Sequence, residues 1–179
     1  EVGYSEDSKN SAEFLINKFV KPGKNVLTLK IYRWSTGSYL ECQDFWRISG
    51  IERDVFLYSQ PKAALKDFRV TSTLDDTYKD GIFKLGVDLR NNGSTAGNMT
   101  LVYELLDANG KVVATGEKAT NVAAGETRTV SFDQTLPDVK TWTSEAPNLY
   151  KLVMTVKENG KVNEIIPFNV GFRRIEIKP

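Results

Sequence analysis

Aromatic side chains and carboxylates stand close together in residues 32–50, YRWSTGSYLECQDFWRISG. The segment has neither the strict alternation of a strand nor a clean helical period. Aromatic faces stack on the apolar face of a pyranose, and carboxylates accept hydrogen bonds from its hydroxyls, so this composition is typical of a sugar-binding loop. A carboxylate beside aromatic rings also suits a hard cation, which prefers oxygen ligands. The residues concerned are Trp34, Tyr39, Phe45 and Trp46, together with Glu41 and Asp44.

A purely structural role explains the same segment. In that interpretation it is a long connection that Trp34 and Trp46 pin to a β-sandwich. Composition alone favours this structural role over a sugar site. Its charged side chains would then pair with one another, Arg33, Arg47 and Arg53 with Glu41, Asp44 and Asp54.

Composition excludes several kinds of chemistry. The 179 residues contain no histidine and one cysteine, which excludes Ser-His-Asp and Cys-His catalysis and a Cys/His zinc site. The 24 basic and 23 acidic residues leave a net charge of +1, so nucleic acid is a poor candidate partner. Asp75, Asp76 and Asp80 share one turn and could hold calcium, but their spacing is not that of an EF-hand loop, and a solvated turn is favoured.

Most of the chain predicts β-strands. Residues 26–34 and 53–59 are alternating runs, whereas residues 11–20 fit a helix or a strand equally well. Beyond Pro61, short strands recur with turn signals every 8–12 residues, which predicts an immunoglobulin-like sandwich. Asn109-Gly110 and Asn159-Gly160 predict tight hairpins whose turn residues have positive φ. The runs in the sandwich are 65–74, 81–91, 98–107, 111–120, 126–136, 149–160 and 161–177.

Both ends of the chain resemble the β-galactosidases of glycoside hydrolase family 2. VGYSEDSK (2–9), AEF (12–14), PGKNVL (22–27) and YRWSTGSYLECQDFWRISGIERDVFLY (32–58) resemble the second half of that family's sugar-binding jelly-roll domain. TWTSEAPNLYKLVM (141–154) and VGFRRIEIKP (170–179) resemble the end of the immunoglobulin-like domain that follows, up to the entry into the catalytic (β/α)8 barrel. Residues 62–140 are supported only by their strand pattern and position.

The resemblance implies an all-β chain in three parts. Residues 1–61 would be the C-terminal part of the jelly-roll, residues 62–172 the immunoglobulin-like sandwich, and residues 173–179 the lead-in to a barrel outside this chain. Trp142 and Tyr150 are expected to be at least partly buried, with APNLY entering a core strand. The abrupt start, without Met or leader, predicts a piece of a longer protein. Because 26–34 and 53–59 would bury one face against strands before residue 1, residues 1–61 are expected to associate by strand exchange or edge pairing, or to stay partly mobile.

Asp44 is the site residue that the resemblance carries over. In the family motif the aspartate before the aromatic-Trp pair, here in QDFW, ligates a sodium ion and contacts the galactosyl 6-hydroxyl. Cys42 stands where the family often has aspartate and is expected to be structural; Glu52 stands where an aromatic residue is common. Sodium is the expected cofactor of the parent enzyme, with magnesium as an open further one, and neither is expected to bind this part alone.

The resemblance implies a function for the parent protein. Family members are retaining enzymes that use two barrel glutamates, so this chain should be inactive alone and should serve a homo-oligomeric β-galactosidase as a scaffold. The Asn163-Glu164 pair is similar to the Asn-Glu pair of some retaining glycosidases, but it follows a hairpin and is interpreted as a surface accident. The alternatives are a stand-alone carbohydrate-binding module, an adhesin-like sandwich, or a β-glucuronidase or β-mannosidase. The compartment stays open between bacterial cytoplasm and periplasm.

Overall fold

The computed structural model describes residues 1–6, 10–40 and 49–177. The chain divides into two compact units, Glu1–Tyr58 and Ser59–Pro179. Each is described by itself. None of the helices in the described ranges is long and apolar enough to cross a membrane.

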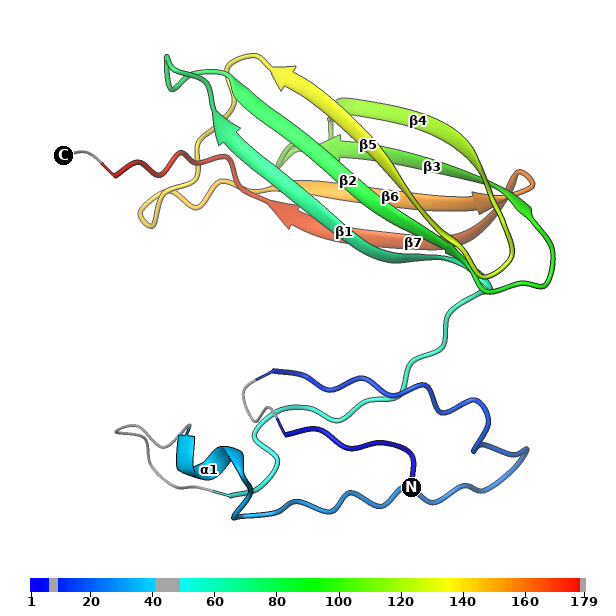
Figure 1. The fold of residues 1–179 in the computed structure, drawn as a ribbon. Helices are drawn as coiled ribbons and strands as arrows, with labels where there is room; N and C mark the ends of the chain where they lie inside the picture. Colours follow the sequence, from blue (N-terminus) through cyan, green and yellow to red (C-terminus); the bar gives the residue numbers. More distant parts are fainter. Residues whose placement is uncertain (7–9, 41–48, 178–179) are drawn as a thin grey trace. The chain divides into compact units, whose positions relative to one another are not determined.

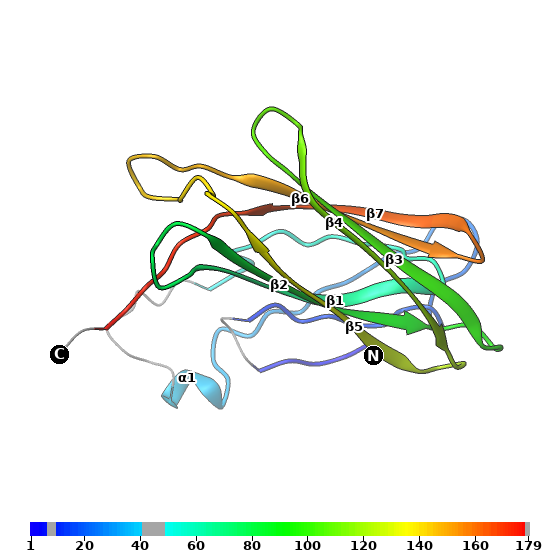
Figure 2. The same cartoon turned by 90° about the horizontal axis from the view of Figure 1, so that it is seen from above.

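The second unit is an antiparallel β-sandwich (Figure 1). One sheet has the strand order β1-β2-β5 and the other β4-β3-β6-β7, and Figure 2 shows them as two layers. The fourth strand pairs with the third, so it lies on the sheet that also holds the last two strands, an arrangement found among immunoglobulin-like folds. The strands are β1 (Ala63–Leu74), β2 (Gly81–Asn91), β3 (Gly97–Leu106), β4 (Val112–Val122), β5 (Thr127–Leu136), β6 (Tyr150–Glu158) and β7 (Lys161–Val170).

The core lies between the two sheets and follows the alternation of the sequence. In β2, β3 and β6 every second side chain is buried, because neighbouring residues of a strand point to opposite faces. Each large apolar side chain buried in this way contributes about 1.5–3 kcal/mol. The inward residues of these strands include Phe83, Leu85, Val87, Leu89, Met99, Leu101, Tyr103, Leu105, Leu152, Met154 and Val156.

The two Asn-Gly hairpins differ from one another. Asn159 and Gly160 have φ values of 49° and 81°, so the predicted turn with two positive φ angles is confirmed there. At the other hairpin only Gly110 is in that region, with a φ of 79°, and the prediction for Asn109 is wrong. The loop is one residue longer than a two-residue turn, and the Asp107 carboxylate accepts hydrogen bonds from the backbone N–H of Asn109 and Lys111, both at 2.9 Å. A type I turn followed by one left-handed glycine satisfies that loop.

The first unit has little regular secondary structure. Its described part contains one short helix, α1 (Gly37–Leu40), and a turn closed by the Phe19 N–H on the Ile16 carbonyl at 2.8 Å. The strands predicted at 26–34 and 53–59 are wrong, and residues 11–20 form neither a helix nor a strand. None of the described residues 1–58 is buried, and Val26 and Leu57 are 81% and 79% exposed. An alternating run becomes a strand only when a neighbour pairs with its backbone, and this unit supplies no such neighbour in the ranges described.

Candidate functional site

Asp44 lies in residues 41–48, outside the described residues, and so do Glu41, Cys42 and Trp46. The sugar and sodium contact therefore stays a prediction. Nearby, the guanidinium of Arg33 lies 5.5 Å from the ring centre of Trp34. Arg33, Arg53 and Asp54, which belong to the set considered for ion pairing, form no ion pair with one another. The other members of that set, Glu41, Asp44 and Arg47, lie outside the described residues, so the pairing as a whole stays a prediction.

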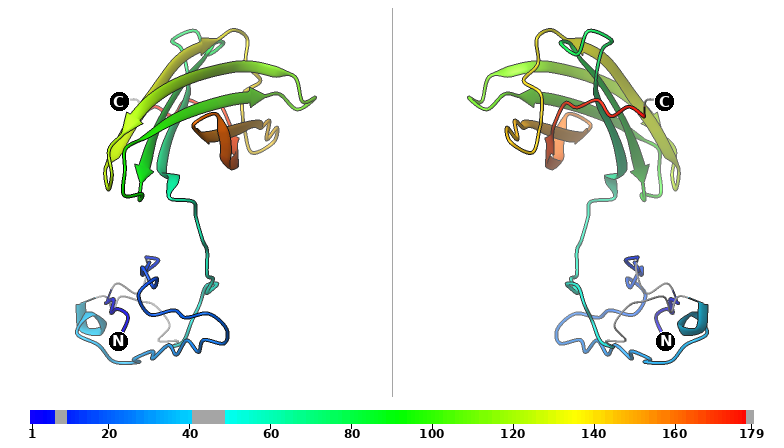
Figure 3. Two further views of the ribbon diagram at one scale, coloured as in Figure 1. Left: turned by 90° about the vertical axis from the view of Figure 1, so that its right-hand side faces the viewer. Right: turned by 90° about the vertical axis from the view of Figure 1, so that its left-hand side faces the viewer.

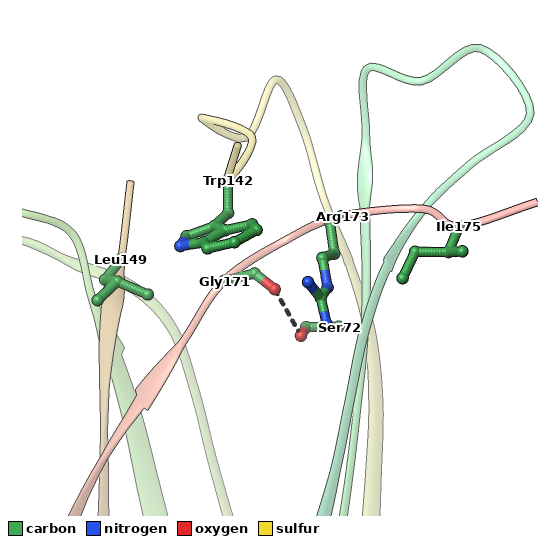
Figure 4. A pocket seen from close by; sticks show the side chains of 6 residues that line it. All are labelled: Ser72, Trp142, Leu149, Gly171, Arg173 and Ile175. Atoms are coloured by element: carbon green, nitrogen blue, oxygen red, sulfur yellow. Dashed lines mark hydrogen bonds between the residues drawn. The ribbon is translucent and has the colours of Figure 1, made fainter. Parts of the chain in front are cut away.

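The described residues form an open hollow at the end of the sandwich where the chain leaves β7 (Figure 4). It has a volume of about 480 Å³. Three segments line it: the C-terminal half of β1, the connection between β5 and β6, and the run that follows β7. The right-hand view of Figure 3 shows that run, in red, passing the connection between β5 and β6, in gold. The lining residues are Ser72, Trp142, Leu149, Gly171, Arg173 and Ile175.

Trp142 is held at the hollow by backbone hydrogen bonds. Its N–H donates to the carbonyl of Phe172 at 2.8 Å, and Thr141 forms an isolated parallel bridge with Phe172. The side-chain amide of Asn148 closes the loop by donating to the carbonyl of Thr141 at 2.9 Å. The indole is half-buried, as the sequence predicted, and the loop that carries it has a fixed geometry.

Tyr150 anchors the same loop from the core side. It is the first residue of β6 and is buried, which confirms the prediction for APNLY. Its hydroxyl accepts a hydrogen bond from the N–H of Lys140 at 2.9 Å, and its ring packs edge-on against Phe172 at 5.3 Å between centres. A tyrosine at the start of this strand that bonds back to upstream backbone is a recurrent feature of immunoglobulin-like sandwiches.

Gly171 is needed because the indole of Trp142 passes so close to the backbone. A Cβ at this position would lie 3.0 Å from Cβ of Trp142 and 3.1 Å from its Cγ. The carbonyl of Gly171 accepts a hydrogen bond from Oγ of Ser72 at 2.9 Å, which ties the exit run to β1. The backbone at Gly171 therefore forms the floor of the hollow. It follows β7 of one sheet and is bonded to β1 of the other.

Two consecutive arginines leave this backbone in different directions. In an extended chain neighbouring side chains point to opposite sides. The guanidinium of Arg173 lies over the ring of Trp142, 5.1 Å from its centre. The guanidinium of Arg174 instead lies 5.2 Å from the ring centre of Tyr78, where Nη1 is 2.7 Å from Oδ1 of Asp76 and Nε is 2.5 Å from Oε1 of Glu176. Arg174 thus pins the exit run to the turn between β1 and β2.

That turn uses the three aspartates considered for calcium. Asp75 accepts hydrogen bonds from the hydroxyl of Thr77 at 2.6 Å and from the N–H groups of Lys79 and Asp80 at 3.0 Å. The Thr77 bond, supported by the backbone donors, lowers the pKa of Asp75 to about 2. Asp80 accepts from the N–H of Asp138, and Asp76 pairs with Arg174. The three carboxylates have separate partners, and the ranges described contain no cluster of three His, Cys, Asp or Glu that could hold a metal ion.

Asn163 and Glu164 have a structural role, so their interpretation as a surface accident is wrong. Glu164 Oε2 accepts the N–H of Leu65 at 2.8 Å, beside the bulge of β1 where the ladder with β2 shifts register. The side-chain amide of Asn163 donates to the carbonyl of Ala63 at 3.0 Å. The pair therefore joins β7 to the start of β1 across the two sheets.

The lining of the hollow combines polar and apolar groups. None of its lining residues is an acid, so it has no general acid and base pair. It offers one cation, one hydroxyl and an apolar rim. Sequence analysis did not identify it, because its residues come from three segments that lie far apart along the chain.

Comparisons with known proteins identify the class of this chain. The model described as "Glycosyl hydrolases family 2" matches residues 63–173, and the model described as "Glycosyl hydrolases family 2, sugar binding domain" matches residues 1–61. The chain therefore belongs to glycosyl hydrolase family 2, as its resemblance predicted.

Its curated relatives include β-galactosidases. The chain is 42% identical over 179 residues to the β-galactosidase of Priestia megaterium, which covers 99% of this chain and 17% of the relative. It is also 42% identical over 177 residues to that of Halalkalibacterium halodurans, with 98% and 17% covered. The chain thus spans about 17% of the length of these relatives.

Solved structures support the fold. The β-glucuronidase of Bacteroides uniformis matches with a TM-score of 0.68 at 19% identity, over 73% of this chain and 17% of that one. A putative β-galactosidase from Bacteroides fragilis matches with a TM-score of 0.57 at 25% identity, over 62% of this chain and 16% of that one.

Proposed function

We propose that this chain is the non-catalytic accessory portion of a retaining β-galactosidase that hydrolyses terminal β-galactosides. The observation that carries the proposal is the 42% identity to the β-galactosidase of Priestia megaterium along 99% of the chain. The sandwich would scaffold a catalytic barrel, and the segment around Asp44 would reach the sugar from the side. The described residues support a scaffold, because their polar groups are used in turns, clamps and strand ladders.

The proposal gives Asp44 one role in substrate binding and one in ion binding. A carboxylate that bridges a monovalent cation and a sugar hydroxyl orients the ring without taking part in proton transfer. Residues outside this chain would complete that site, as the resemblance to the family implies. Sodium would supply positive charge at the galactosyl 6-hydroxyl, and magnesium is an open further cofactor of the parent enzyme.

The first test uses a chromogenic β-galactoside with two proteins. The purified 179-residue chain should show no turnover, because its proposed role is non-catalytic. A longer polypeptide that carries this chain together with the residues encoded before and after it should hydrolyse the substrate. Hydrolysis by the chain alone that survives further purification would contradict the non-catalytic role. An inactive longer polypeptide would contradict the β-galactosidase assignment.

The second test concerns Asp44 in that longer polypeptide. Asp44→Ala should lower kcat/KM on the order of 10²-fold, because it removes a positioning contact, and should abolish the dependence on sodium. Asp54→Ala is the matched control, since Asp54 is exposed and has no ion pair in the part of the chain described. Unchanged kinetics and sodium dependence in Asp44→Ala would return the residue to a structural role.

A further inference from the structure

The segment that leads into the sandwich is exposed and yet held by hydrogen bonds. The second unit starts at Ser59, and β1 starts at Ala63. The residues between them, Gln60, Pro61 and Lys62, are all exposed. Exposed residues ahead of a strand usually move freely, because few contacts restrain them. In this chain, polar groups from β7 and from the end of β2 bind residues 60–65, which we call the entry segment.

The carboxylate of Glu164 in β7 binds the entry segment with both of its oxygens. Oε2 accepts the N–H of Leu65 at 2.8 Å, and Oε1 accepts the side-chain amide of Gln60 at 3.3 Å. The same amide of Gln60 also donates to the carbonyl of Leu65 at 3.1 Å. These three residues therefore form a closed ring of hydrogen bonds, and its two bonds to a carboxylate are of the stronger, charge-assisted kind.

Two backbone carbonyls of the entry segment are bound as well. The carbonyl of Lys62 accepts the N–H of Asn92 at 2.7 Å, and that of Ala63 accepts the side-chain amide of Asn163 at 3.0 Å. Asn92 follows β2 of one sheet, and Asn163 belongs to β7 of the other. Pro61 adds a fixed φ. The entry segment is thus restrained from both sheets, although it precedes the first ladder.

A catalytic role for Glu164 fits these contacts less well. A general acid or base needs an oxygen that can reach the substrate. Both oxygens of Glu164 already accept hydrogen bonds from the entry segment. The carboxylate is therefore used to hold the chain.

We propose that Gln60 and Glu164 make the entry into the sandwich a stiff joint, and that Gln60 is thereby a positioning residue for the galactosidase reaction. The joint limits the directions in which the residues before Ser59 can leave the sandwich. Those residues include the segment around Asp44, which in the proposed function reaches the sugar from the side. The consequence for the reaction rests on that proposed function, whereas the stiffness of the joint does not.

Limited proteolysis of the 179-residue chain tests the joint directly. Trypsin cleaves after lysine, and Lys30 and Lys62 are both exposed. Lys30 lies outside any strand of the first unit and should be cleaved readily. Cleavage after Lys62 should be at least tenfold slower, because a protease needs extended backbone free of other hydrogen bonds, and this backbone must open first. Equal rates at the two sites would overturn the joint.

Gln60→Ala isolates the part of the clamp that holds the start of the segment. The substitution removes both bonds of the Gln60 amide and leaves the bond between Glu164 and Leu65 in place. Cleavage after Lys62 should rise about fivefold, as expected when about one hydrogen bond's net contribution is lost from a segment that opens locally. Glu164→Ala should raise it at least tenfold, because the N–H of Leu65 then also loses its acceptor.

Gln134→Ala is the matched control. The side-chain amide of Gln134 donates to the carbonyl of Thr115 at 3.1 Å, a bond of the same kind elsewhere in the sandwich. This variant should leave the cleavage after Lys62 unchanged when it is normalised to the cleavage after Lys30. Gln60→Ala should melt within about 2 °C of the unsubstituted chain, since Gln60 is exposed and precedes the first strand, so faster cleavage there reports local opening.

The longer polypeptide tests the positioning role through the kinetic constants. Gln60→Ala should raise the KM for a chromogenic β-galactoside about fivefold and leave kcat nearly unchanged. A looser joint lowers the fraction of molecules in which the segment around Asp44 is in place, and the apparent affinity falls by that fraction. Saturating substrate restores the population, so kcat is retained. Gln134→Ala should change neither constant.

Each outcome decides one part of the inference. Faster cleavage after Lys62 in Gln60→Ala, together with a raised KM, supports both the joint and the positioning role. Unchanged cleavage in that variant overturns the joint, whatever the longer polypeptide hydrolyses. Faster cleavage with an unchanged KM overturns the positioning role. A longer polypeptide without activity contradicts the proposed function, and the cleavage rates after Lys62 still decide the joint.

Discussion

Replacing Tyr103 with phenylalanine should stabilise this protein. Tyr103 is fully buried between the sheets, against Phe83 and Phe132, and its hydroxyl has no hydrogen-bond partner among the described residues. A buried hydroxyl without a partner costs about 1–3 kcal/mol. Deleting the oxygen leaves a gap of roughly 15 Å³, which costs about 0.4 kcal/mol at about 24 cal/mol per Å³. The net gain is about 1 kcal/mol.

Thermal unfolding of the 179-residue chain measures this gain, and Tyr150→Phe is the matched control. A gain of about 1 kcal/mol raises the melting temperature by about 2–4 °C in a chain of this size. Tyr150→Phe should instead destabilise by about 1 kcal/mol, because its hydroxyl accepts the N–H of Lys140 at 2.9 Å. Both substitutions remove a tyrosine hydroxyl from a buried ring of the same sandwich. They differ because the hydroxyl of Tyr150 has a hydrogen-bond partner and that of Tyr103 has none among the described residues.

The difference between Tyr103 and Tyr103→Phe should also depend on pH. Burial raises the pKa of Tyr103 above its ordinary value of 10.0. The unfolded chain therefore loses this proton first, and the stability tied to the neutral phenol is lost as the pH rises beyond 10. Phenylalanine cannot titrate, so its advantage should grow above pH 10. A destabilisation of 1 kcal/mol or more at pH 7, or an advantage that shrinks above pH 10, would refute the assignment of an unsatisfied hydroxyl.

Three other features of the described residues give further expectations. Asn159→Ala should lower the free energy of unfolding by about 1 kcal/mol, because the φ of 49° at this residue is unfavourable for alanine. Asn109→Ala should change it by less than about 0.5 kcal/mol. Equal effects of the two substitutions in urea titrations would contradict the two turn geometries. The carboxyl of Asp75 should titrate near pH 2 by NMR, so its stabilisation of the turn is present above pH 4 and lost as the pH falls toward 2; a midpoint near 4 would remove the role of Thr77. Amides of residues 26–34 should exchange much faster than those of β3 and β6 because they have no strand partners in the described unit; uniformly slow exchange together with a monomeric mass in dilute solution would contradict this.

The strands of the sandwich were largely predictable because the alternation of apolar and polar residues is visible within each of them. The run 81–91 alternates apolar and polar residues, and β2 has those bounds with Phe83, Leu85, Val87 and Leu89 inward. The run 161–177 was too long, because its pattern continues through GFRRIEI while the strand ends at Val170. Beyond that residue the backbone leaves the ladder, and Arg174 bonds to the turn at Asp76 instead. No local pattern reports such a partner, which lies 98 residues away along the chain.

The hollow could not be predicted for the same physical reason. Its residues come from three segments, and each looks ordinary by itself: a serine in β1, a tryptophan in a loop, and an arginine after β7. The tertiary fold gives Arg173 an aromatic partner and leaves it without an acidic one in the described part of the chain. A charge pattern in the sequence shows only that both arginines are cations.

Residues 26–34 show that an alternating pattern alone does not make a strand. VLTLKIYRW alternates as well as β3 does, yet β3 forms a strand and this run does not. The difference lies in their neighbours, because β3 pairs with β4 on one side and with β6 on the other. Alternation states which face a strand would bury, whereas the hydrogen bonds of the backbone require a second strand in register. A sequence therefore specifies a strand only to the extent that it also supplies the partner, and in this chain the sandwich does so for all seven of its strands.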